Sequence, residues 1–420
     1  MGPGLTTAAD IDLARWVRPG DTVMWGQAAA EPVSLVRALA DQRHRFQRTR
    51  AILGVGHCGV LQPGHADAIE FLAYCGSGCN RQLADAGVLD IWPGRYSELP
   101  AQIRAGALRV DVLMLQVAPP DAQGRYSLGL AQEYLLAALD TARVVIVEVN
   151  DQVPWTFGER YLEAGRIDAH VQASYAPLPS RTGGGGAVER AIAAHAARLV
   201  EDGATLQCGL GALPDAILAA LSDRRDLGIH SGTIGDGVAD LMEAGVVTNA
   251  RKGRDVGVTV AGVMMGGERL FRFAHRNPAI SLRGTEYTHA ADVLASLPRF
   301  VAINSALEVD LTGQVNAEVA AGRYVGAVGG APDFLGGAHR SRGGVPMVAL
   351  ASTAGSHSRV VARLAGPVST PRCDAGVFVT EYGIADLRGL PIAARIRRMI
   401  DIAHPDHRER LERFTKDSPS

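Results

Sequence analysis

Two glycine-rich segments could bring bare backbone close to a ligand. Residues 209–214, GLGALP, follow an apolar run and precede a helical pattern, so their amides could bind a phosphate or a carbonyl oxygen. Residues 326–330, GAVGG, suit a loop that lies against an extended cofactor. Neither segment has the Gly-Lys-Ser/Thr of a nucleotide-binding P-loop. Tight strand–helix packing at 209–214 and a plain connecting loop at 326–330 are the alternatives.

Two polar residues stand where buried strands are predicted to end. His230 follows the run DLGI, and open α/β sheets place ligands at the carboxyl ends of their strands. It could act as an acid, a base or a hydrogen-bond donor, or be a structural histidine. Glu381 follows the run GVFVT, where a carboxylate needs a partner, and Arg388 is the predicted one. Glu381 is therefore either a structural anchor or a site residue.

The cysteines and histidines do not predict a metal site. Cys75 and Cys79 have C-x-x-x-C spacing, with His57 and Cys58 nearby in sequence, but no second cluster completes a set of four ligands. Five cysteines in 420 residues also argue against a disulfide scaffold. We expect no bound metal.

The elements that must position these residues occur twice. Residues 18–38 and 201–220 each contain a glycine turn, a β-favouring run that ends at a glycine, a loop of small residues and an apolar-periodic helix. Further along, residues 110–129 and 300–318 each place D-x-x-G after an apolar run. This weak internal repeat predicts two similar domains.

Near-continuous apolar runs such as 143–150 and 376–383 are typical of buried parallel strands, and helical patterns alternate with them. We therefore predict an α/β fold with mainly parallel sheets and flanking helices. The residues 176–187, rich in Pro, Ser and Gly, predict a flexible linker. The domains are expected at 1–180 and 188–420, with a pocket where they meet. The tail is expected to finish in a surface helix and a frayed end.

The overall composition argues against several classes of partner. Forty-two basic and 44 acidic residues give a net charge of −2, so no strong field favours nucleic acid or a membrane surface. The N-terminus lacks a signal-peptide pattern, and no apolar run of about 18 residues could span a bilayer. We expect a soluble, cytoplasmic protein.

Six segments occur in an order that resembles the acetyl-CoA hydrolase/transferase family. They are EVNDQVP (148–154), CGLGALPDAIL (208–218), GIHSGTIGDGVADLMEAGVVTN (228–249), INSALEVDLTGQVNAE (303–318), VTEYGIADLRGL (379–390) and IAHPDHRERL (402–411). The stretch VTEYGIADLRG is highly specific, and the resemblance spans the whole chain. Within the family, the sequence is most similar to 4-hydroxybutyrate and acetate CoA-transferases.

The resemblance implies two NagB/RpiA-like domains that bind acyl-CoA between them, in a homodimer. It implies that coenzyme A enters as an acyl-CoA thioester and that a small carboxylic acid or water is the second reactant. The residues implied to contact CoA form the thioester loop and parts of two later segments: Gly209, Leu210, Gly211, Ala212, Leu213, Ala306, Gly329 and Gly330.

The residue that carries the covalent step in this family is absent. Its transferases use the glutamate of G-I-H-(S/T)-E, whose carboxylate attacks the thioester to give an acyl-glutamyl anhydride and then a glutamyl-CoA thioester. Here G-I-H-S is followed by Gly232, which cannot be a nucleophile, an acid or a base. The lost side chain predicts room for a bulkier substrate or an ordered water beside His230 and Asp236.

Three explanations of Gly232 remain open. In the first, water or a substrate group attacks a thioester polarised by the 209–213 amides, since oxyanion-type stabilisation alone retains much of a rate enhancement. In the second, Glu286 or Glu308 supplies the carboxylate, although Glu308 belongs to the ordinary pattern of the family. In the third, the chain binds acyl-CoA without turnover, or the glycine is an introduced substitution.

Overall fold

The chain forms two compact units in a computed structural model that describes residues 6–7, 11–180 and 185–417. Unit 1 consists of Met1–Ser180, Val260–Thr288 and Arg323–Val325, and unit 2 of Arg181–Thr259, His289–Gly322 and Gly326–Ser420. A segment from the second half of the sequence therefore packs with the first half. The expected domains, 1–180 and 188–420, stay a prediction. Residues 181–184 of the predicted linker lie outside the described residues.

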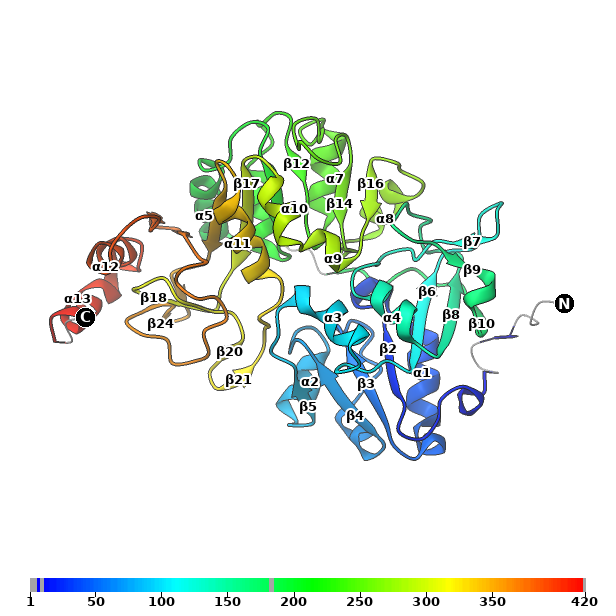
Figure 1. The fold of residues 1–420 in the computed structure, drawn as a ribbon. Helices are drawn as coiled ribbons and strands as arrows, with labels where there is room; N and C mark the ends of the chain where they lie inside the picture. Colours follow the sequence, from blue (N-terminus) through cyan, green and yellow to red (C-terminus); the bar gives the residue numbers. More distant parts are fainter. Residues whose placement is uncertain (1–5, 8–10, 181–184, 418–420) are drawn as a thin grey trace. The chain divides into compact units, whose positions relative to one another are not determined.

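Unit 1 is built on one eight-stranded sheet in the order β1-β10-β8-β6-β2-β3-β4-β5, in which each adjacent pair is parallel (Figure 1). Its strands are β1 (Thr6–Thr7), β2 (Thr22–Trp25), β3 (Thr49–Leu53), β4 (Ile69–Ala73), β5 (Leu89–Ile91), β6 (Val112–Val117), β8 (Val144–Asn150) and β10 (Ala169–Ala173). Its α-helices are α1 (Val33–Gln42), α2 (Asn80–Asp85), α3 (Leu99–Arg104), α4 (Leu135–Thr141), α8 (Glu268–Ala274) and α9 (Thr285–Thr288). β6 and β8 are buried along their whole length, which explains their continuous apolar sequences.

Unit 2 is built on a six-stranded sheet in the order β12-β11-β17-β22-β26-β27, parallel except for the last pair. Its strands are β11 (Thr205–Cys208), β12 (Gly228–Ile229), β17 (Phe300–Ser305), β22 (Val345–Ala349), β26 (Val377–Thr380) and β27 (Gly383–Asp386). Its α-helices are α5 (Ala187–Ala197), α6 (Ala212–Ala219), α7 (Asp236–Glu243), α10 (Ala291–Ser296), α11 (Ala331–Arg340), α12 (Ile392–Asp401) and α13 (Pro405–Asp417). α11 packs over β17 and β22, and α5 packs against α6 and β26 (Figure 1).

Short strands complete the two units. Three of them in unit 2, β18 (Glu308–Asp310), β19 (Val315–Asn316) and β25 (Val360–Val361), form one small sheet, and β23 (Thr353–Ala354) pairs with β24 (His357–Ser358). In unit 1, β7 (Arg125–Tyr126) pairs with β9 (Leu162–Glu163). The remaining short strands are β13 (Thr233–Ile234), β14 (Thr259–Ala261), β15 (Val263–Met264), β16 (Ile280–Leu282), β20 (Val319–Ala320) and β21 (Arg323–Tyr324).

The predicted α/β class with mainly parallel sheets is confirmed, and the internal repeat is visible in both sheets. β2 pairs in parallel with β6 in unit 1, and β11 pairs in parallel with β17 in unit 2. In each unit the first of these strands leads through a loop into a helix, α1 or α6. The run 376–383 contains the buried strand β26, which pairs in parallel with β22 as predicted, and the chain reverses after Thr380 into the antiparallel β27.

Each unit has its own hydrophobic core. Trp25, Leu39 and Phe46 belong to the core of unit 1, and Phe300 and Phe378 to that of unit 2. The predicted tail helix is present as α13, and the end expected to fray, 418–420, lies outside the described residues. No helix within 6–7, 11–180 and 185–417 is long and apolar enough to cross a membrane.

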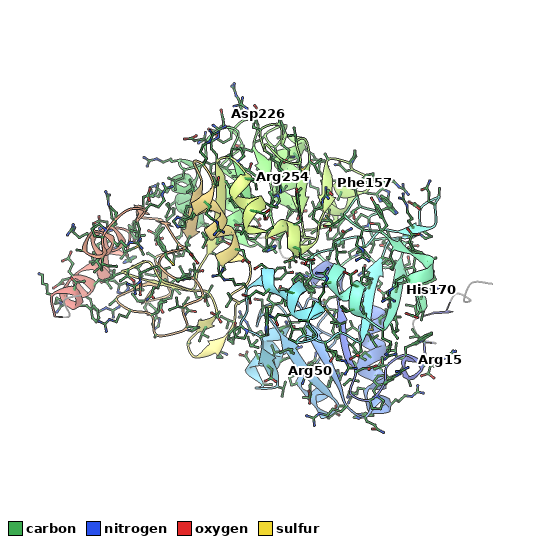
Figure 2. The ribbon with its side chains drawn as sticks, viewed as in Figure 1. Arg15, Arg50, Phe157, His170, Asp226 and Arg254 are labelled. Carbon is green, nitrogen blue, oxygen red and sulfur yellow. The ribbon has the colours of Figure 1, made fainter. Side chains whose placement is uncertain are left out.

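Charged residues at the outer surface of each unit contribute little to holding the fold. Figure 2 labels Arg50, which pairs with Glu70 at 2.9 Å, and Asp226, which pairs with Arg251 at 3.1 Å. Ion pairs of this exposed kind contribute about 0–1 kcal/mol each. The stability of both units must therefore come mainly from their cores and from buried hydrogen bonds.

Glu148 is a buried carboxylate that caps a helix. Its Oε2 accepts the backbone N–H groups of Ser34 at 2.8 Å and Leu35 at 3.3 Å, in the first turn of α1, and its Oε1 accepts the hydroxyl of Tyr175. Burial raises the pKa of Glu148, and these hydrogen bonds oppose the rise. Glu148 lies in the family-like segment 148–154, and its contacts give it a structural role.

Substituting Glu148→Ala should lower the free energy of unfolding by about 2–4 kcal/mol, because two amides of α1 and the Tyr175 hydroxyl lose their acceptor. Urea denaturation followed by circular dichroism measures this loss. Glu163→Ala, at an exposed position on β9, is the control and should change stability by less than about 0.5 kcal/mol. A loss below about 1 kcal/mol for Glu148→Ala would show that water replaces the carboxylate.

Candidate active site

The segment that resembles the CoA-thioester loop begins at the carboxyl end of β11 in unit 2. The N–H of Gly209 donates to the carbonyl of Ile303 at 3.2 Å and so joins the ends of β11 and β17. Gly211 has a φ of +118°, which L side chains rarely adopt, and it directly precedes α6. Glycine at 211 is thus required by the backbone, which turns there from strand to helix.

A cavity of about 310 Å³ lies beside this loop. It opens at the carboxyl ends of β11, β17 and β22, where open α/β sheets bind their ligands. Five of the residues implied to contact CoA line it: Leu210, Gly211, Ala212, Leu213 and Ala306. Leu210 exposes 37% of its surface, so a large apolar side chain faces an open space. The residues of this cavity all belong to unit 2.

Arg359 holds one wall of the cavity. Its Nε donates to the carbonyl of Leu307 at 2.8 Å and its Nη2 to that of Ala306 at 2.5 Å. Burial lowers the pKa of Arg359, and the charge of Glu381 opposes this shift. No sequence signal marked Arg359, because its partners are backbone carbonyls of a segment far away in the chain.

Glu381 serves as an anchor for the turn after β22. Its carboxylate accepts the N–H of Ser352 at 2.9 Å and the hydroxyl of the same residue at 2.6 Å. The predicted partner, Arg388, is wrong: its guanidinium binds Asp386 at 2.7 Å instead. The physical reason is that Asp386 and Arg388 are near neighbours at the end of β27, so the arginine finds a local carboxylate.

The segment that contains Gly232 is fastened to the start of the loop. The hydroxyls of Ser231 and Thr233 both donate to the carbonyl of Cys208, at 3.2 and 3.4 Å. His230, which is fully buried, donates its backbone N–H to Leu206 at 3.0 Å. The position of the family's glutamate therefore lies next to the carboxyl end of β11, from which the loop 209–213 begins.

The ring of His289 lies close beside Gly232 and leaves little of the predicted room in the direction of a side chain. A Cβ built on Gly232 would lie 3.0 Å from Cε1 and 3.1 Å from Nε2 of His289, and 3.4 Å from the ring of Phe334. A Cβ on Gly330 would lie only 2.6 Å from the same Nε2. The rings of His289 and Phe334 have centroids 4.4 Å apart. Gly232, the position of the family's glutamate, and Gly330 therefore both lie against the imidazole of His289.

Burial, together with a smaller effect of the neighbouring His230, lowers the pKa of His289 to about 3. The imidazole of His289 is consequently neutral at physiological pH. Sequence reasoning missed His289, although it lies only three residues after Glu286. The only sequence feature that could have pointed to His289 is that it is a histidine in a chain whose usual catalytic glutamate is replaced by Gly232.

Neither of the two alternative carboxylates, Glu286 and Glu308, is among the described residues that line the cavity. Glu286 stands in the first turn of α9 in unit 1, largely exposed, and pairs with Arg104 at 2.6 Å. Glu308 begins β18 in unit 2, where burial raises its pKa and an N–H of Ala365 opposes the rise. Glu308 is not among the described residues that line the cavity. Their chemical roles, like that of His230, stay predictions.

The remaining residues that the sequence suggested for CoA or metal binding do not line the cavity. Gly209 and Gly329 are not among its lining residues, and Gly329 has a φ of +59° in the turn before α11. The five cysteines are free. Within the described ranges, no three His, Cys, Asp or Glu side chains group as metal ligands would. The absence of a metal therefore stays an expectation.

Comparison with known proteins identifies the family. The profile of the acetyl-CoA hydrolase/transferase N-terminal domain matches residues 7–168, and that of the C-terminal domain matches residues 266–414. A 4-hydroxybutyrate coenzyme A transferase of Clostridium kluyveri is 37% identical over 395 residues, which are 93% of this chain and 92% of that protein.

Two solved structures share the fold. The crystal structure of RipA from Yersinia pestis has a TM-score of 0.94 and 34% sequence identity, and it covers 98% of this chain and 97% of its own. A 4-hydroxybutyrate CoA-transferase from Porphyromonas gingivalis has a TM-score of 0.83 and 31% identity, with the same coverage. The sequence segments, the parallel sheets and these likenesses agree, and the chain belongs to the acetyl-CoA hydrolase/transferase family.

Proposed function

We propose that this protein binds an acyl-CoA at the loop 209–213 of unit 2 and hydrolyses its thioester. The observation that carries the proposal is the cavity of about 310 Å³ that brings four residues of this loop together with Ala306. The relative from Clostridium kluyveri supports coenzyme A as part of the ligand, since its name describes a 4-hydroxybutyrate coenzyme A transferase. The cavity lies at the sheet edge where such folds bind ligands.

Gly232 makes water the favoured acceptor. The glutamyl route needs a carboxylate that forms first an anhydride and then a thioester, and Gly232 offers none. With water, an acyl-CoA gives a free carboxylic acid and free CoA, and no carboxylate of the enzyme is acylated. Backbone amides that polarise the thioester carbonyl would still stabilise the transition state. We place this reaction in the cytoplasm, as the sequence predicts, and on a homodimer, as the resemblance to the family implies.

A thiol-trapping assay tests the proposal. The protein is incubated with a panel of acyl-CoA esters, from acetyl to longer and hydroxylated chains, with and without acetate or a larger carboxylate. Hydrolysis should release free thiol at a rate that does not depend on the added carboxylate. Acyl exchange that requires the carboxylate, without net thiol release, would instead indicate a transferase, and calorimetric binding without any reaction would indicate a binding protein.

Glu308→Gln in the same assay tests the route through a second carboxylate. Because the side chain of Glu308 is not among the described residues of the cavity wall, we expect thiol release to remain within about twofold of the unmodified protein. A large loss of thiol release on this substitution would place the covalent step at Glu308 and contradict direct attack by water.

A further inference from the structure

Arg359 is a partly buried cation that forms no ion pair with the residues that the structure describes. Its Nε and Nη2 donate to the carbonyl oxygens of Leu307 and Ala306, which carry no net charge. The charge of Glu381 acts on Arg359, but both oxygens of that carboxylate accept hydrogen bonds from Ser352 instead. A partly buried charge without a counter-ion is costly, and the cost falls when a ligand supplies the opposite charge.

The guanidinium of Arg359 has one edge left for a ligand. Nε and Nη2 form the edge that holds the two carbonyl oxygens, at 2.8 and 2.5 Å. Nη1 and the second N–H of Nη2 form the other edge, and no acceptor among the described residues bonds to Nη1. Because Arg359 lines the cavity of about 310 Å³ and is only partly buried, a ligand in the cavity has access to this edge. Two parallel N–H donors on a planar group match two oxygens of a carboxylate or a phosphate.

We propose that Arg359 is the anion-binding residue of this cavity and holds a negatively charged oxygen group of the acyl-CoA. This inference rests on the proposed function, because it names the residue that positions the ligand at that same site. The observation that carries it is a charge without an ion-pair partner on a fixed guanidinium in the wall of an open cavity. The carbonyls of Leu307 and Ala306 hold the side chain in place before the ligand binds, so little side-chain entropy is lost on binding.

The rest of the cavity wall directs an anion toward Arg359. Most of the other lining residues are uncharged, among them Leu210, Leu213 and Leu350. The carboxylate of Glu189 on α5 also lines the cavity, and within the described part of the chain it forms no ion pair with Arg359. Because Glu189 repels a second negative charge, the two side chains together orient a ligand that has one anionic end and one neutral end.

An acyl-CoA has two sources of such an anionic group. The phosphates of the CoA moiety are present in every ester, whereas a carboxylate in the acyl group is present only in esters of dicarboxylic acids. Both groups offer the pair of oxygens that a guanidinium edge binds. The first source makes Arg359 a residue that binds CoA itself, and the second makes it the residue that selects dicarboxylic acyl groups.

Arg359→Gln tests the proposal, because it removes the charge and keeps a polar side chain. Isothermal titration uses free CoA, two stable CoA thioethers that carry a propyl or a carboxyethyl group, and the propyl thioether of pantetheine, which has no charge. Loss of a charged donor should weaken binding about 10- to 100-fold. A bound phosphate predicts this loss for all three CoA ligands, and a bound acyl carboxylate predicts it for the carboxyethyl thioether alone. The pantetheine thioether should bind both proteins with affinities within about twofold of each other.

Two further variants serve as controls. Arg363→Gln removes the same charge from an exposed residue that does not line the cavity, and it should leave all four affinities within about twofold. Arg359→Lys keeps the charge but not the edge of two donors, so it should weaken the same ligands by only about 3- to 10-fold. Thermal melting shows whether each variant is folded, and Arg359→Lys provides the test if Arg359→Gln does not fold.

The outcomes separate this inference from the function on which it rests. An equal loss of affinity for the neutral pantetheine thioether and the CoA ligands would show that Arg359 only supports the wall, and unchanged affinity for all four would show that it binds none of them. Either result overturns the inference and leaves the proposed function standing. If the predicted losses occur but the unmodified protein releases thiol from no acyl-CoA, the proposed hydrolysis fails and the anion site stands.

Discussion

Substituting Ala212→Trp should weaken acyl-CoA binding by at least about 100-fold, which corresponds to about 2.7 kcal/mol. Ala212 is the first residue of α6 and lines the cavity beside the loop 209–213. An indole at this position would occupy much of a space of about 310 Å³ and exclude the ligand. Isothermal titration with acetyl-CoA and free CoA measures the loss.

The same helix offers a matched control. Ala219, the last residue of α6, is exposed and does not line this cavity, so Ala219→Trp should leave the affinity within about twofold. Both variants should change the free energy of unfolding by less than about 1 kcal/mol, since neither introduces the indole into a core. Equal affinity of Ala212→Trp and the unmodified protein would exclude this cavity as the CoA site.

The contribution of Glu133 to stability should fall as pH rises from about 4.5 to about 7, and Glu133→Gln should remove this contribution. Glu133 is buried in unit 1, and burial raises its pKa to about 7, against the opposing hydrogen bonds from Tyr96 and Gln27. The folded protein therefore holds the proton more tightly than the unfolded chain. The contribution of Glu133 is complete below about pH 4.5 and is lost as pH rises through about 7.

The size of this effect follows from the two pKa values. The loss reaches at most about 3 kcal/mol at pH 8, because the side chain must then be buried with its charge. In the unmodified protein, Oε2 of Glu133 accepts the hydroxyl of Tyr96 at 2.5 Å and the side-chain amide of Gln27 at 2.8 Å. A glutamine at this position keeps an oxygen that can accept both hydrogen bonds, and it carries no charge. Glu133→Gln should therefore be more stable than the unmodified protein at pH 8 by about 1–3 kcal/mol and nearly equal to it at pH 4.5.

Urea denaturation at pH 4.5, 6, 7 and 8 measures both curves. Burial also raises the pKa of Glu31 to about 7. Because of Glu31, the free energy of unfolding of the Glu133→Gln variant should still depend on pH between about 4.5 and 7. Glu163→Gln, at an exposed position, is the control and should follow the unmodified protein at each pH. Parallel curves for Glu133→Gln and the unmodified protein would show that Glu133 is charged throughout.

The sequence by itself determined the features that depend on local pattern. The continuous apolar run at 143–150 predicts a buried parallel strand because both faces of such a strand are covered, and β8 occupies Val144–Asn150. The run 176–187, rich in Pro, Ser and Gly, predicts a break between two regular segments, and α5 begins at its last residue, Ala187. The repeated strand–loop–helix pattern predicted two similar sheets, because each pattern needs the same neighbours to bury its apolar face.

The tertiary structure alone decided which distant residues meet. No local pattern in the sequence predicts that His289 lies beside Gly232. Likewise, none predicts that Glu381 accepts a hydrogen bond from Ser352. The packing of Val260–Thr288 with unit 1 also has no local sequence signal. These contacts depend on the order of strands in a sheet and on which side chains are buried together, and neither leaves a periodic signal along the chain. Gly232 was therefore recognisable from sequence as a missing carboxylate, whereas the imidazole of His289 beside it was visible only in the folded chain.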